Sequence, residues 1–281
     1  MTRFKILNTY DARNEISKID DYLLKMKPVE RRLKCKANQD VELDQFVLFL
    51  RDCVLEPTKE NHNKLTIAIN QLKRLVEKYN LHTPSVINII KTDGRDEWNS
   101  AYTRGNSIVL PSKKLDFYSE EDLVKLLVHE YFHVISRFNP GLRRNLYGLL
   151  GFVEIEDGLV PSSIMDRTLN NPDALILTGI ANEKNQLEVP LITIKSDNVD
   201  DTKDILESIR IEVYLEGEKK LVDIEEAPVV KSSLMINVSH IQHPEETLAE
   251  NFTHLLAQSG EIENTKLLNQ MSKILRNDIK K

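Results

Sequence analysis

Residues 119–133 read SEEDLVKLLVHEYFH, and this stretch decides the fold and the chemistry that we expect of the chain. Ser119 can cap a helix, with an acidic residue three positions later as in a capping box. The apolar residues that follow predict that the helix is buried. We expect the helix to end near Asn139-Pro140, because proline disfavours helical backbone in the residue before it.

Two histidines of this helix are placed to share a metal ion. His129 and His133 are four residues apart, so they project from the same face about one turn apart. Two imidazoles in that arrangement are typical of a zinc site, and Glu130 lies where a carboxylate can hold and deprotonate a zinc-bound water. The buried helix would keep the ligands rigid. We therefore predict a Zn²⁺ cofactor, with His129 and His133 as ligands and Glu130 as the catalytic base.

Strands are predicted on both sides of this helix. Val86–Ile90 is a short apolar run of strand type, and residues 100–110 predict a hairpin that turns at Arg104-Gly105-Asn106. Further strand-like runs follow the helix at Leu175–Leu177, Val189–Ile194 and Ile209–Leu215. The tail from Pro244 onward is helical again, so the sequence predicts an α+β fold.

The beginning of the chain predicts helices. Its apolar residues recur at helical spacing, at Phe46, Val47, Leu50 and Val54 and again at Leu65, Ile69, Leu72, Leu75 and Val76. We predict a helical N-terminal region over residues 1–82 and a catalytic domain over residues 83–281. Residues 152–230 would form a β-rich insertion within that domain.

A catalytic zinc ion needs a third protein ligand and one open position. Residues 243–252 read HPEETLAENF, and the proline predicts the start of a helix. On that helix Glu246 and Glu250 lie four residues apart on one face. One carboxylate can bind the metal while the other accepts the free N–H of a ligand histidine. His243 is the alternative third ligand.

Together, the two motifs resemble the gluzincin metallopeptidases, in which HExxH is followed by a helix of the form ExxAExF. The second motif is similar to that of the anthrax lethal factor family of peptidases. This resemblance implies a zincin-like domain in which Glu246 is the third ligand and Glu250 supports a ligand histidine. It also implies that the hairpin before the helix is the edge strand that lines the substrate cleft. The wider run from His129 to Phe152 resembles uncharacterised bacterial metallopeptidase-like proteins.

One feature departs from the gluzincin pattern. The gap from His133 to Glu246 is longer than in compact gluzincins, which suggests that residues 152–230 are inserted and shape or gate the cleft. The oxyanion of peptide hydrolysis usually needs a donor besides zinc. Lethal factor-like sites use a tyrosine just upstream of the ligand helix for this purpose, but the corresponding residues here, Val238-Ser239-His240, include none. His240 and Tyr147 are therefore the two candidates for this catalytic role.

The composition argues against several other classes of protein. The net charge is −6, without a dominant basic block, so we expect no nucleic-acid partner. No apolar run is long enough to span a membrane, and the first 21 residues predict no secretory signal. We expect a cytoplasmic protein, or one delivered by a signal-independent secretion route. Cys35 and Cys53, the only cysteines, fit no zinc-binding spacing, and we expect reduced thiols in helices.

The sequence thus predicts a zinc-dependent endopeptidase that acts on protein or peptide substrates. Glu130 would assist the attack of a zinc-bound water on the peptide bond. The alternative is a non-catalytic protein-interaction module stabilised by zinc. A structural zinc site needs no general base and usually has a fourth protein ligand, which argues against the alternative.

Overall fold

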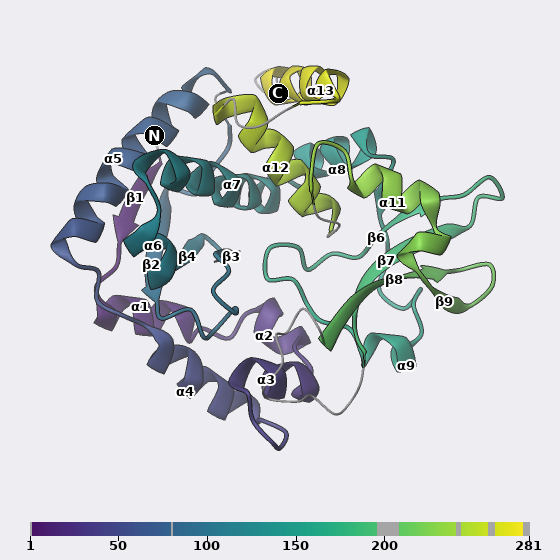
Figure 1. Ribbon diagram of the computed structural model, residues 1–281, viewed down its shortest axis with the longest axis horizontal. Coiled ribbons are helices and arrows are strands. Elements are labelled where there is room, and N and C mark those ends of the chain that lie inside the picture. The colour runs from purple at the N-terminus through teal and green to yellow at the C-terminus, as the bar shows by residue number, and fades with distance from the viewer. Residues whose placement is uncertain (1, 80, 196–207, 240–242, 258–261, 278–281) are drawn as a thin grey trace.

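The computed structural model describes residues 2–79, 81–195, 208–239, 243–257 and 262–277 (Figure 1). The fold is α+β, as predicted, with two separate sheets among the described residues. The first sheet contains β1 (Arg3–Ile6), β2 (Val86–Thr92), β4 (Ser107–Pro111) and β3 (Tyr102–Arg104), in this order. Strands β1, β2 and β4 are parallel, whereas β3 is the antiparallel edge strand. The predicted hairpin is therefore confirmed as β3 and β4.

Helices cover both faces of this sheet, so the residues of its central strands, β2 and β4, are buried almost throughout. The helices around it are α1 (Thr9–Ile16), α2 (Asp21–Lys25), α3 (Pro28–Cys35), α4 (Leu43–Cys53), α5 (Lys59–Val76), α6 (Ser112–Phe117) and α7 (Glu120–Phe138). Because side chains alternate along a strand, Ile89 packs into the core with α5 and α7. Ile90, the next residue, packs into the core with α1 and α4.

The HExxH helix, α7, begins and ends where its sequence predicts. Ser119 accepts a hydrogen bond from the backbone N–H of Asp122, and acidic residues fill the first turn. The helix ends at Phe138, and Pro140 opens the next helix, α8 (Pro140–Leu149). Leu123 and Leu127, one turn apart, are fully buried, as predicted.

Residues 152–230 contain the second sheet, which is antiparallel throughout. Its strands, in order, are β5 (Val153–Glu154), β6 (Thr178–Ala181), β7 (Leu187–Ile194), β8 (Ile209–Leu215) and β9 (Lys220–Asp223). The short helix α9 (Ser162–Met165) lies between β5 and β6. The strand predicted at Leu175–Leu177 is wrong, because regular pairing starts only at Thr178. These three residues instead form the end of the loop between α9 and β6.

Three α-helices follow the second sheet in the described part of the chain, and one of them, α12, packs against α7. They are α11 (Pro228–Leu234), α12 (Pro244–Ala257) and α13 (Thr265–Asn277). Helix α12 starts at Pro244, as predicted, and lies alongside α7 in Figure 1. Phe132 on α7 and Phe252 on α12 are both buried, with ring centres 5.4 Å apart. This aromatic pair fixes the two motif helices against each other.

The N-terminal region differs from the prediction in one respect. Besides its helices, it contributes β1, which pairs in parallel with β2, so residues 1–82 supply one strand of the first sheet. A run of only four residues was too short for its period to be recognised. Within the described ranges, none of the helices combines the length and the apolar character needed to cross a membrane.

Candidate metal centre

Three predicted ligand residues meet between α7 and α12. One ligand atom from each of His129, His133 and Glu246 lies within 4.8 Å of the other two. The Glu246 Oε2 atom is 3.2 Å from His129 Nε2 and 3.5 Å from His133 Nε2. The two imidazole rings are 4.9 Å apart and nearly perpendicular. Two ring nitrogens and a carboxylate oxygen are a typical donor set for catalytic zinc.

The strongest sign that these residues fit a metal ion is a pair of unsatisfied atoms. Among the described residues, His133 Nε2 and Glu130 Oε2 are the buried side-chain atoms without a hydrogen-bond partner. Both side chains are almost completely buried. Leaving such a polar atom unpaired costs about 1–3 kcal/mol, so a protein rarely retains two of them at one place without a use. A cation bound by His133 Nε2 would remove the first penalty, and a water beside that cation would remove the second.

Each ligand histidine is also held on its second ring nitrogen. His133 Nδ1 lies 3.2 Å from Glu245 Oε1, and His129 Nδ1 lies 3.5 Å from Glu250 Oε2. Carboxylates in these positions fix the orientation and the tautomer of a ligand imidazole. Glu250 therefore lies where the predicted support of a ligand histidine would lie, and it faces His129.

Glu245 is a residue of this group that the sequence analysis missed. Its Oε2 accepts hydrogen bonds from the Ser136 hydroxyl at 2.9 Å and from the Tyr147 hydroxyl at 2.6 Å. Glu245 and its two donors are all buried. No local signal identified it, because Glu245 directly precedes Glu246 and only the crossing of α12 over α7 turns it toward His133.

The charges of the centre depend on one another. Burial alone would lower the pKa of His129, but hydrogen bonds with Glu246 and Glu250 raise it to about 9. Burial likewise opposes protonation of His133, yet the charges of Asp173 and Glu246 raise its pKa well above the ordinary value. Burial favours protonation of Glu246, but the charge of His133 and the hydrogen bond with His129 hold its pKa well below the usual range.

Glu130 is almost completely buried and lies beside His133 and Asp173. Burial raises the pKa of Glu130 to about 8, and the nearby charge of Asp173 acts in the same direction. A pKa near neutrality suits a group that must accept and release a proton during one reaction cycle. A bound cation would shift this pKa downward.

Two of the remaining predicted site residues, Tyr147 and His243, have partners other than the three ligand residues. The Tyr147 hydroxyl donates to Glu245, on the Nδ1 side of His133, and burial raises the pKa of Tyr147 well above its ordinary value. His240 lies outside the described residues. His243, the alternative third ligand, accepts the backbone N–H of Glu245 at 3.1 Å through its Nδ1, which places it at the start of α12.

A loop of the second-sheet segment also reaches the centre. Asn171 donates to Glu246 Oε1 at 2.8 Å. One ligand atom from each of Asp173, Glu130 and His133 lies within 4.8 Å of the other two. Sequence reasoning missed both loop residues, since a lone Asn-Pro-Asp turn carries no periodic or spacing signal.

A second group of suitable residue types, Cys53, Asp93 and Asp96, is less suited to a metal ion. Burial raises the pKa of the Cys53 thiol, so its metal-binding thiolate form is disfavoured. Asp93 forms an ion pair with Arg95 at 2.7 Å, and Asp96 accepts hydrogen bonds from Thr92 and Tyr102. The carboxylates of this group therefore already have protein partners.

No family model matches the sequence, and neither a curated protein nor a solved structure matches the chain. The resemblance to gluzincins therefore depends on the motif residues themselves. What the structure adds is their convergence: residues from two helices, more than a hundred positions apart in the sequence, meet at one point.

Proposed function

We propose that this protein is a zinc metallopeptidase of the gluzincin type, built on a zincin-like domain. The observation that carries the proposal is the convergence of His129, His133 and Glu246 beside the two unsatisfied atoms, His133 Nε2 and Glu130 Oε2. Glu246 would be the third ligand, and protein or peptide chains the substrates.

The roles of the residues follow from their positions. When bound, zinc supplies a Lewis acid that polarises the peptide carbonyl. The Glu130 carboxylate accepts a proton from the attacking water as the water oxygen bonds to the carbonyl carbon. Glu130 then delivers this proton to the nitrogen of the leaving amine as the C–N bond breaks. Glu245 and Glu250 keep the imidazoles of His133 and His129 oriented throughout.

A non-catalytic zinc-stabilised protein is the second candidate, and Asp173 is the observation that favours it. A structural zinc site usually has four protein ligands. Asp173 is close enough to His133 to be considered as a fourth one. Glu130 argues for the catalytic proposal, because a structural site has no use for an unpaired buried carboxylate.

The proposal is tested by measuring zinc content and peptide cleavage on the same preparation. The full chain is loaded with zinc, dialysed and analysed by elemental analysis, and we expect one equivalent. Cleavage of a quenched-fluorescent peptide library should be lost with 1,10-phenanthroline and restored by added zinc. Less than one equivalent of zinc in correctly folded protein would contradict the proposed metal centre. One equivalent without cleavage, in the wild type and in Asp173→Ala, would favour the non-catalytic candidate.

A further inference from the structure

The loop between α9 and β6 extends from the second sheet toward β3 and α7 (Figure 1). We call residues 170–173 the crossing loop. Asp173 at its end accepts two hydrogen bonds from Thr103 of β3, from the backbone N–H at 2.6 Å and from the hydroxyl at 2.8 Å. The crossing loop therefore lies directly against the edge strand.

This contact uses the hydrogen-bonding groups that an extended peptide would need. A peptide adds to an edge strand through the outward backbone N–H and C=O groups of that strand. Strand β3 has only three residues, and the N–H of its central residue, Thr103, is taken by Asp173. The Thr103 carbonyl is 3.4 Å from the Arg137 guanidinium, which also holds the carbonyl of Pro172 at 2.9 Å. The edge is thus covered at its centre.

The same aspartate lies beside the proposed catalytic base. One ligand atom from each of Asp173, Glu130 and His133 lies within 4.8 Å of the other two, so the Asp173 carboxylate is close to both the proposed base and a proposed ligand. Asn171, two residues earlier, donates to Glu246. The crossing loop therefore lies beside residues of the metal centre on both α7 and α12.

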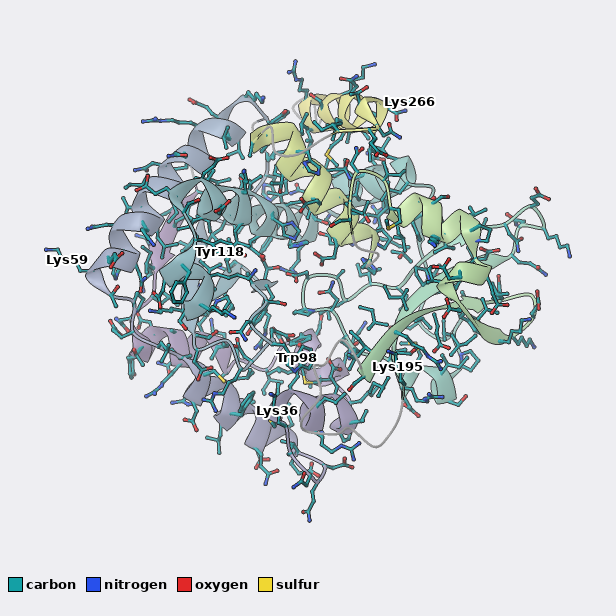
Figure 2. The ribbon with its side chains drawn as sticks, in the orientation of Figure 1. Lys36, Lys59, Trp98, Tyr118, Lys195 and Lys266 are labelled. Atoms are coloured by element: carbon teal, nitrogen blue, oxygen red, sulfur yellow. The ribbon has the colours of Figure 1, made fainter. Side chains whose placement is uncertain are left out.

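The N-terminal helices hold the other end of the crossing loop. Asn170 donates to the buried Glu30 of α3, at 2.7 Å from its side chain and 3.2 Å from its backbone. Helix α3 is anchored in turn by Lys34, which pairs with the buried Glu97 at 2.5 Å. The Lys34 ammonium also lies 4.2 Å from the ring centre of Trp98, which is labelled in Figure 2.

We propose that the crossing loop is an internal latch that keeps the peptidase closed at rest. In the latched state, Asp173 occupies the edge of β3 and lies beside Glu130 and His133, so a peptide cannot add to this edge in extended form. Withdrawal of the loop frees Thr103 and the metal together. This inference rests on the proposed function, because a latch is meaningful only where a substrate must reach the metal.

The size of the effect follows from the population of the open state. If the open state makes up a tenth of the molecules or less, the apparent affinity for a ligand of that state is weakened about tenfold or more. Removing the latch should therefore strengthen the apparent affinity by the same factor. Acetohydroxamate is a suitable probe, because it binds an open metal position and needs no catalysis.

The experiment uses the full zinc-loaded chain in three variants. Asp173→Ala removes the contact with Thr103, and Asn170→Ala releases the loop from α3 far from the metal. Asp166→Ala is the control, because this exposed residue of the same segment forms only a surface ion pair with Lys27, at 3.7 Å. Acetohydroxamate affinity is measured by calorimetry, the coordination by the absorption spectrum of the cobalt-substituted protein, and activity by peptide cleavage.

A latch predicts that acetohydroxamate binds about tenfold or more tightly to Asp173→Ala and Asn170→Ala than to wild type. Peptide cleavage should rise by a similar factor, zinc should stay at one equivalent and Asp166→Ala should match wild type. Unchanged or weaker acetohydroxamate binding in both loop variants would overturn the latch, and cleavage by the wild type would then leave the proposed function standing. Loss of zinc from Asp173→Ala alone would make Asp173 a structural ligand and would also overturn the latch. If Asp173→Ala does not fold, Asn170→Ala decides by the same criteria.

Discussion

Helices α7 and α12 contribute to the candidate metal centre in different ways. On α7 the contributing residues follow the helical period, so His129 and His133 share one face. On α12, Glu245 and Glu246 are adjacent, and adjacent residues of a helix point in directions about 100° apart. Each therefore meets a different nitrogen: Glu246 lies at both Nε2 atoms, whereas Glu245 lies at His133 Nδ1.

The difference shows where local pattern stops being informative. Spacing identifies residues that act together when they share a face of one helix. It cannot assign roles to neighbouring carboxylates, because these roles depend on how the second helix crosses the first. The following predictions test whether the division of labour on α12 is as the geometry indicates.

The largest effect is expected for the ligand on α12. Glu246→Ala removes the oxygen that lies between the two Nε2 atoms. Zinc affinity should fall by more than the roughly 10–100-fold typical of a supporting residue, and peptide cleavage should disappear with the metal. A zinc titration followed by competition with a chelator measures this. A larger loss in Glu250→Ala than in Glu246→Ala would reverse the assignment on α12.

The next effect concerns the base on α7. Glu130→Gln preserves the shape of the side chain but cannot accept the proton of water. We expect kcat to fall by about 10²–10⁴-fold, as is typical for loss of a general base. Zinc should remain at one equivalent by elemental analysis. Wild-type rates in this variant would remove Glu130 from the mechanism.

A smaller effect should separate the two supports. Glu245 is completely buried and accepts two hydroxyl donors besides facing His133, whereas the Glu250 side chain is 43 % exposed. Within the 10–100-fold range for supports, Glu245→Gln should weaken zinc binding more than Glu250→Gln. Glu121→Gln is the matched control on α7, because Glu121 forms only an exposed pair with Lys125. If both variants lost zinc affinity equally, the burial of a supporting carboxylate would not determine how much it contributes to zinc binding.

The smallest effect is a pH dependence of zinc binding. The folded-state pKa of His129, about 9, lies above its ordinary value of 6.5. Protonation of His129 therefore stabilises the metal-free fold fully below about pH 6.5, and this contribution is lost as the pH rises through about 9. Zinc must displace that proton, so binding at pH 7.5 should release protons and strengthen toward pH 9. Calorimetry in two buffers of different ionisation enthalpy measures the release, and buffer-independent heats would contradict it.

The secondary structure near the site was largely predictable. The cap at Ser119, the hairpin of β3 and β4, and the start of α12 at Pro244 are all signalled by residues within a few positions. The failures were β1, which is too short to show a period, and Leu175–Leu177, where an apolar run belongs to a loop. Both are positions where long-range packing, and not local preference, decides the conformation.

By itself, the sequence determined the α7 half of the site, because the helical period places His129 and His133 on one face wherever the helix lies. Only the tertiary structure decided that Glu245 faces His133 and that the crossing loop reaches Thr103 and Glu246. Asn171 and Glu246 are 75 positions apart, and Asp173 and Thr103 are 70 apart. Contacts over such distances are set by how whole elements pack, which no local spacing encodes.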